Sequence, residues 1–208
     1  MGFIYADGCN KEDKNSLSIT LQEQDEYILE KFLKELKTNN VVRKSYNKKY
    51  NRHYSRINIS NKRLSQQLSM LGVVSNKTFK ITFPTFINND LLHHFIRGYW
   101  DGDGSIMLNK EKQTPQISVC GNPQFLQGLH QHLLSNINNL KPLTFCEDTR
   151  SKNCFLSSGG RYQIKKILDY IYSDSSIYLT RKYNKYQEIL KFIKEEENEQ
   201  INRNEKVS

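Results

Sequence analysis

The sequence contains one short pattern twice, and this repetition constrains the fold more than any other feature. GFIYADG occupies residues 2–8 and GYWDGDG occupies residues 98–104, so Asp7 and Asp103 lie 96 residues apart. Each motif is followed by an alternating segment, a segment with helical spacing, two further alternating segments and a second helical segment. A repeat of this length indicates two copies of one supersecondary unit. We therefore predict an internally duplicated α+β protein.

The segments after the two motifs have matching periodicity. Apolar and polar residues alternate in SLSITLQ (16–22) and in QISVC (116–120), which predicts strands with one buried and one polar face. Helical spacing follows in 25–37 and in 122–134, where Asn122 and Pro123 form a helix start signal. We expect a first repeat over 1–84, a second over 85–192, and a charged C-terminal tail over 193–208 with a frayed or disordered end.

Charge and composition narrow the class of protein. The formal net charge is +9, and residues 41–63 hold eight Lys or Arg, three Tyr and no acid, which favours a nucleic acid as partner over a merely solvated face. No apolar run is long enough to span a membrane and no signal peptide is visible, so we expect an intracellular protein of the cytoplasm or an organelle matrix, not a secreted one. The four cysteines lack both CxxC spacing and the density of a disulfide scaffold, which favours free thiols.

The motifs combine glycines with carboxylates. Gly98 lies within a helical pattern, LLHHFIRGYWDGDG, and Gly2 occupies the same place in the first motif. A glycine there is best explained by close approach of another backbone. Two helices touching at these glycines would place Asp7 and Asp103 side by side, where they repel each other unless divalent cations such as Mg²⁺ bind between them. A turn explains only the second motif, and an EF-hand loop fails because Ile106 stands where that loop needs glycine.

These motifs point to a family. GFIYADG and IRGYWDGDG resemble the two motifs of the single-chain LAGLIDADG homing endonucleases, and the resemblance covers nearly the whole chain. It implies two pseudo-symmetric αββαββα halves packed through the motif helices, with saddle-shaped sheets on the DNA. It also implies a monomeric, metal-dependent endonuclease of a mobile genetic element, such as an intron, that cuts double-stranded DNA at a long asymmetric target. One metal ion would activate water and another would stabilise the leaving oxygen.

The resemblance also implies roles for individual residues. Asp7 and Asp103 would bind Mg²⁺, or another divalent cation such as Mn²⁺, with help from the backbone carbonyls of Ala6 and Gly102. Asp101 matches an earlier acid of the motif and is expected to be structural, since Tyr5 takes that place in the first half. Family members place a lysine near each centre, and the shared x-K-x-x-K pattern offers Lys77 with Lys182 as the favoured pair and Lys80 with Lys185 as the rival pair.

Alternation suggests which side chains face the DNA. With the isoleucines of HYSRINIS directed at the helices, the remaining residues of that strand face outward. Arginine and glutamine there would read base edges, and cations at the hairpin bend would meet phosphate. The predicted DNA-binding residues are Ser18, Thr20, Gln22, Arg43, Lys48, Lys49, Arg52, Arg56, Asn58, Gln116, Ser118 and Arg150.

Alternatives remain open from the sequence alone. The chain is expected to be either an active nuclease, or an intron-splicing maturase or catalytically inactive DNA- or RNA-binding relative, with structured intron RNA as a further partner. A zinc site is disfavoured because the adjacent His93 and His94 are not expected to share a helix face. Since Met1 alone precedes the first motif, its helix is expected to be barely one turn long, which predicts poor stability or poor cleavage.

Overall fold

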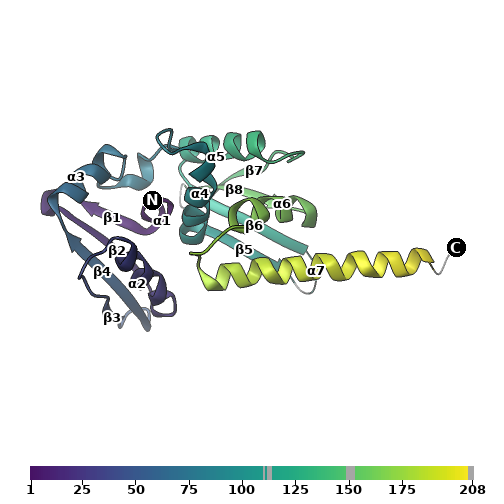
Figure 1. Ribbon diagram of the computed structural model, residues 1–208, viewed down its shortest axis with the longest axis horizontal. Coiled ribbons are helices and arrows are strands. Elements are labelled where there is room, and N and C mark those ends of the chain that lie inside the picture. The colour runs from purple at the N-terminus through teal and green to yellow at the C-terminus, as the bar shows by residue number, and fades with distance from the viewer. Residues whose placement is uncertain (110, 112–113, 149–152, 206–208) are drawn as a thin grey trace.

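The computed structural model describes residues 1–109, 111, 114–148 and 153–205, and over these residues it has two αββαββα units followed by one long helix (Figure 1). The first unit comprises α1 (Gly2–Asp7), β1 (Gly8–Lys11), β2 (Ser16–Gln22), α2 (Glu26–Glu35), β3 (Arg43–Asn47), β4 (Arg52–Ser60) and α3 (Lys62–Met70). The second comprises α4 (Asn89–Asp103), β5 (Gly104–Asn109), β6 (Thr114–Gly121), α5 (Pro123–Asn136), β7 (Thr144–Asp148), β8 (Asn153–Gly159) and α6 (Arg161–Tyr172). The final helix, α7, spans Thr180–Glu205, and short 3₁₀ turns lie at 12–14, 23–25 and 77–79.

Each unit contains one antiparallel four-stranded sheet with the same strand order. The orders are β1-β2-β4-β3 and β5-β6-β8-β7, so the duplication predicted from the sequence is present in the topology and the α+β class is confirmed. Helices cover one face of each sheet (Figure 1). The alternating apolar side chains of β2, β4 and β6 pack beneath these helices, with Ile19, Ile57 and Val119 fully buried. The other face of each sheet carries the polar residues of the same strands.

Periodicity alone did not predict the strands that directly follow the motifs, β1 and β5. Both begin at the glycine that ends a motif, Gly8 or Gly104, and β1 has only four residues. They form because their backbones pair with β2 and β6, with Gly8 opposite Ile19 and Gly104 opposite Val119. The αββαββα order implied by the family resemblance includes them.

Polar side chains cap the helices where the sequence suggests. Asn122 accepts a hydrogen bond from the Phe125 backbone at 2.9 Å, directly before Pro123, as its start signal predicts. Asn61 caps α3 in the same way through the Leu64 backbone, at 2.9 Å.

The two motif helices α1 and α4 cross at their glycines in the centre of the molecule (Figure 1). A Cβ added to Gly2 would overlap the carbonyl oxygen of Phe95, and one added to Gly98 would lie 2.9 Å from the Phe3 nitrogen. The backbones therefore touch where the sequence places glycine, and this contact brings the C-terminal ends of both helices together.

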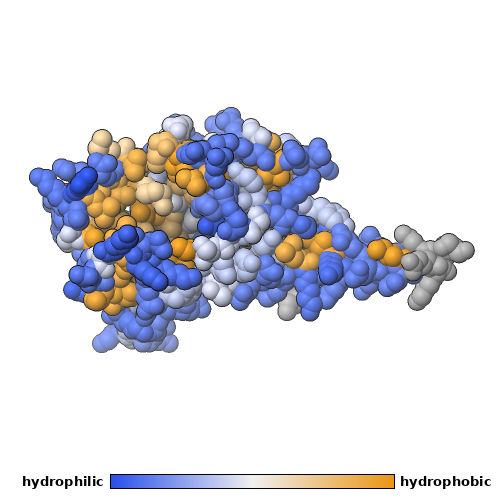
Figure 2. Space-filling view, viewed as in Figure 1, coloured by the Kyte–Doolittle hydropathy of each residue, from blue (hydrophilic) through white to orange (hydrophobic). Residues whose placement is uncertain are grey.

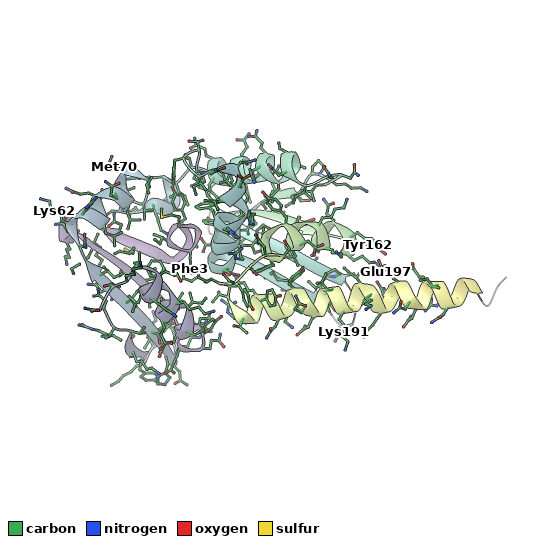
Figure 3. All side chains as sticks on the ribbon, viewed as in Figure 1. Phe3, Lys62, Met70, Tyr162, Lys191 and Glu197 are labelled. Atoms are coloured by element: carbon green, nitrogen blue, oxygen red, sulfur yellow. The ribbon has the colours of Figure 1, made fainter. Side chains whose placement is uncertain are left out.

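The helix α7 extends away from the body of the protein (Figure 1). It is helical to Glu205, so the charged tail expected from residue 193 continues the same helix through most of its length. Its first part packs on the core through Tyr186, Ile189 and Ile193, whereas Lys191 and Glu197 project from it (Figure 3). None of the described helices is both long enough and apolar enough to cross a membrane.

An apolar hollow of about 410 Å³ lies beside the short helix α1. Figure 2 shows hydrophobic side chains gathered on this side of the first unit. The hollow lies at the place where α1 begins and is partly lined by Met1, Phe3, Phe32, Leu64 and Leu68.

Candidate active site

The two motif aspartates lie together at the adjacent C-terminal ends of α1 and α4. A Cβ added to Gly102, the residue before Asp103, would lie 2.9 Å from Asp7 Oδ2 and would overlap the Ala6 side chain. A larger residue at position 102 would therefore displace the Asp7 carboxylate. The glycine between the two aspartates of the second motif thus allows the C-terminal ends of the two helices to approach, which explains its presence in DGDG.

The pKa values of both carboxyl groups are raised above their ordinary values. Burial and the neighbouring Asp103 raise the pKa of Asp7 to about 6, and burial also raises the pKa of Asp103. Two carboxylates at the negative ends of two helices disfavour each other's ionisation. A divalent cation would remove this penalty, and the oxygen ligands present are those that Mg²⁺ and Mn²⁺ prefer.

Lys77 lies at the end of the first motif helix. Its side chain is 9% exposed, and its ammonium donates to the Ala6 carbonyl at 2.6 Å. Burial lowers the pKa of Lys77, while Asp103 and Asp7 act in the opposite direction. This is the only hydrogen bond of the Lys77 ammonium to any described residue, so two of its protons remain for groups entering the site. The Ala6 carbonyl is shared between this ammonium and any metal ion that it would help to bind.

Lys182 lies at the end of the second motif helix and is bound more completely. Its ammonium donates to the carbonyls of Trp100, Asp101 and Gly104 at 2.7, 2.5 and 2.6 Å, with Gly102 at 3.5 Å. Burial lowers the pKa of Lys182 to about 8. Its three protons are thus occupied by the last turn of α4, where unpaired carbonyls favour a cation. By contrast, Lys80 is exposed and Lys185 pairs with Glu188, which favours the pair Lys77 and Lys182 over its rival.

Asp101 has a structural position, as expected. It is 3% exposed and accepts hydrogen bonds from the Tyr172 hydroxyl at 2.5 Å and the Leu179 backbone at 2.9 Å. It therefore joins α4 to the segment that leads into α7, the helix in which Lys182 lies. In the first unit the Tyr5 hydroxyl instead donates to the Leu71 carbonyl, which ties α1 to the end of α3.

Sequence reasoning missed two groups beside this site. The Tyr99 hydroxyl donates to the Cys120 carbonyl at 2.9 Å and lies close enough to Asp103 for each to shift the other's pKa. Alignment of the motifs places Phe3 opposite Tyr99, and this difference was the available signal. Arg181 of α7 pairs with Asp25 of the first unit at 3.0 Å and lowers the pKa of Asp7 against the larger effect of burial. Nothing in the sequence places Asp25 beside α7.

The outward face of the first sheet carries most of the predicted DNA-binding residues. Arg56 and Thr20 line a hollow of about 620 Å³ together with the turn residues Lys48 and Lys49. The prediction for Ser18 is wrong in one respect: it lies on the expected face but is only 5% exposed, because the neighbouring strands β1 and β4 enclose it. The other predicted residues of this face that are exposed are Gln22, Arg43, Arg52 and Asn58.

The outward face of the second sheet is less basic. Gln116 and Ser118 line a smaller hollow of about 260 Å³, with Gln116 exposed and Ser118 half-buried. Arg150 lies outside the described residues. Within the described part, all four cysteines are free thiols, and two of them, Cys120 and Cys146, lie on this face.

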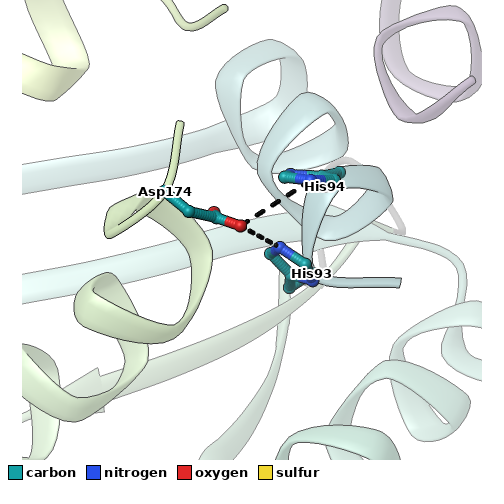
Figure 4. A group of neighbouring side chains, drawn as sticks. All are labelled: His93, His94 and Asp174. Carbon is teal, nitrogen blue, oxygen red and sulfur yellow. Dashed lines mark hydrogen bonds and ion pairs between the residues drawn. The ribbon is translucent and has the colours of Figure 1, made fainter. Parts of the chain in front are cut away.

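His93 and His94 form a cluster with Asp174 (Figure 4). The expectation that the two histidines point apart is wrong: their Nε2 atoms lie 3.0 and 3.8 Å from Asp174 Oδ2. However, Arg97 donates to His94 Nδ1 at 2.8 Å, so the proton of a neutral His94 ring is on Nε2, where a metal would need a lone pair. The arrangement therefore favours hydrogen bonding to the carboxylate over metal binding.

No family model and no curated protein matches this sequence. Solved structures with the same fold include the I-SmaMI LAGLIDADG homing endonuclease bound to cleaved DNA, with a TM-score of 0.60, 13% identity and coverage of 95% of this chain and 89% of that chain. I-SmaMI bound to an uncleaved DNA target with calcium ions gives a TM-score of 0.57 at 12% identity, covering 93% and 87%. Full-length DUF199/WhiA from Thermatoga maritima gives 0.60 at 18% identity, covering 99% of this chain and 63% of that chain.

Proposed function

We propose that this chain, which has the LAGLIDADG homing endonuclease fold, is a divalent-metal-dependent endonuclease that cuts both strands of double-stranded DNA at a long asymmetric target. The observation that carries the proposal is the pairing of Asp7 and Asp103 at the adjacent ends of α1 and α4, in a protein whose two sheets each carry a hollow on the outward face. Two neighbouring carboxylates repel each other unless a positive charge compensates them, and a bound divalent cation supplies that charge.

The residues present fit a metal site. Asp7 and Asp103 would hold Mg²⁺ or Mn²⁺, and the Gly102 carbonyl is available as a further oxygen ligand because Lys182 approaches it only at 3.5 Å. When bound, the metal would polarise the scissile phosphate and lower the pKa of water. Burial on the protein side excludes bulk water from this point and strengthens the electrostatic interactions within it.

The two lysines would have different roles in the reaction. Lys77 has protons free toward the paired carboxylates and would stabilise the charge that develops on the phosphate oxygens. Lys182 would keep the end of α4, and with it Asp103, in place for the reaction. The first sheet would bind DNA mainly through its cations, because Lys48, Lys49 and Arg56 surround one hollow.

Both centres lie in one chain, so the protein would act as a monomer. We place it inside the cell, in the cytoplasm or an organelle matrix, and infer a mobile genetic element, such as an intron, as its coding context. These assignments rest on the family resemblance of the motifs together with the free thiols.

A second candidate function is binding of DNA, or of structured intron RNA as in a maturase, without cleavage. The same fold occurs in WhiA, so the fold alone does not imply cleavage.

The test is incubation of the protein with a randomised duplex library in Mg²⁺, with EDTA and with the Asp7→Asn/Asp103→Asn variant as controls. Discrete cut sites that require Mg²⁺ and both aspartates are the expected result. Salt-sensitive binding of DNA or RNA without cutting would replace the proposal with the second candidate.

A further inference from the structure

The strand pairing defines one equivalent row of outward side chains in each sheet. Each row begins one residue after the residue that pairs with the last glycine of a motif. In the first sheet Gly8 pairs with Ile19, and in the second Gly104 pairs with Val119. The next residue along each strand points outward and starts a row that crosses three strands. The first row is Thr20, Arg56 and Arg43, and the second is Cys120, Phe155 and Cys146.

The first row is built for a ligand with hydrogen-bond acceptors. Arg43 and Arg56 are direct cross-strand partners, and both are exposed. Like charges directly opposite each other destabilise a sheet. Neither guanidinium group has an ion pair or hydrogen bond to any described residue, in contrast to the Lys44 ammonium, which pairs with Glu23 at 3.0 Å. The paired guanidiniums therefore gain nothing from the folded protein itself.

The equivalent row of the second sheet has the opposite chemistry. Phe155 takes the place of Arg56, and Cys146 takes the place of Arg43. Phe155 is half-buried and its neighbours Cys120 and Cys146 offer thiols in place of charge. The adjoining row, Ser105, Ser118, Ser157 and Thr144, is formed of small hydroxyl side chains. A base edge would therefore meet the apolar ring of Phe155 here, beside small hydroxyl and thiol side chains.

The second row also lies close to the paired carboxylates. Asp103 is near enough to Cys120 to raise the pKa of its thiol, after the larger effect of burial. A base touched by this row would therefore lie near the position at which the strand is cut.

We propose that the two rows read different base pairs at pseudo-symmetric positions of one DNA target. The Arg43–Arg56 row selects guanine, since arginine binds guanine O6 and N7 in the major groove, and the Phe155 row selects thymine through its C5 methyl group. This inference rests on the proposed DNA binding but not on cleavage. It makes Arg56 and Phe155 the residues that set the asymmetry of the target.

The first test is selection from a randomised duplex library by the full chain in Ca²⁺, followed by sequencing. The expected consensus has G·C in one half and T·A at the pseudo-symmetric position of the other. Replacing that thymine by uracil removes only the methyl group and is expected to weaken binding several-fold. An unchanged affinity with uracil would overturn the role assigned to Phe155.

Exchange of side chains between the rows sharpens the test. Phe155→Arg is expected to change the preference at its position from thymine to guanine by roughly tenfold, and Arg56→Phe is expected to do the reverse. Phe155→Ala should lose the thymine preference without gaining another, and Lys34→Ala, an exposed cation on α2, serves as the control for charge.

The outcomes separate the inference from the proposed function. Selection of a defined target whose base preferences do not respond to Phe155→Arg or Arg56→Phe would overturn the inference and leave the proposed function standing. Uniform weakening by Arg56→Phe across all sequences, with a smaller salt dependence, would show a phosphate contact and also overturn it. Absence of any selection from DNA by the unmodified protein would overturn both.

Discussion

Lys77 and Lys182 occupy equivalent places in the two units and are bound differently. Lys77 donates once, to the end of a six-residue helix, whereas Lys182 donates three short hydrogen bonds to the end of a fifteen-residue helix. The last turn of α4 presents unpaired carbonyls that a buried cation can satisfy. Two copies of one unit can thus place the same residue type at the same point and give it different numbers of hydrogen-bond partners, which on the proposed function leaves Lys77 as the reactive lysine.

The largest expected effect distinguishes these roles. Lys182→Met should lower the free energy of unfolding by about 3–5 kcal/mol, because it leaves buried carbonyls and Asp101 without their cation. Chemical denaturation without metal measures the change, and Lys185→Met on the same helix is the control. A loss no greater than that of the control would contradict the structural role of Lys182.

The helix crossing gives the next effect. Gly2→Ala should cost about 3 kcal/mol or more, because its methyl group would overlap a backbone carbonyl in α4, and Gly98→Ala should cost less. Gly159→Ala is the control, since no atom lies within 4 Å of its added Cβ. Thermal unfolding of the three variants checks this order, and equal values would show that the two helices do not depend on close contact.

Protonation of the paired carboxylates gives a third effect. The folded-state pKa of Asp7 is raised to about 6 by burial and by Asp103, so its contribution favours folding at low pH and is lost as pH rises through 6. Without metal, the free energy of unfolding should therefore fall by up to about 3 kcal/mol between pH 4 and 7 on this account. Asp7→Asn should reduce this fall. The same pH dependence in both proteins would mean that the carboxylates are not strained by each other.

The smallest stability effect is expected at Lys77. Lys77→Met removes one hydrogen bond and should change the free energy of unfolding by about 1 kcal/mol, while it lowers kcat for strand cleavage by roughly a hundredfold with little change in KM. Steady-state kinetics on a selected target provide the measurement. Full turnover in this variant would assign Lys77 the same passive role as Lys182.

Much of this arrangement could be predicted from local sequence. The Asn122–Pro123 helix start and the alternation in β2 and β4 reflect interactions within a few residues. The contact between the motif glycines joins distant segments and could be predicted only because the motif occurs twice. The contacts of His93 and His94 with Asp174 and the ion pair between Asp25 and Arg181 could not be predicted, because the partners are distant in sequence. The burial of Ser18 likewise follows from the strands on both sides of it and not from its own segment.

The candidate site shows the same limit. The x-K-x-x-K pattern located both lysines, yet it gave no sign that one is saturated by carbonyls and the other is not. The difference arises because Lys182 lies in α7 against the end of α4, whereas Lys77 lies in the short 3₁₀ turn at 77–79. Such differences between repeats appear only when the packed structure is known.

The central claim is that Asp7 and Asp103 together bind a divalent cation, and Mn²⁺ binding followed by electron paramagnetic resonance tests it most directly. The unmodified protein should bind Mn²⁺, Mg²⁺ should compete for the same site, and the Asp7→Asn/Asp103→Asn variant should lose this binding while it remains folded. Equal Mn²⁺ binding by the variant would show that the paired carboxylates are not the metal site.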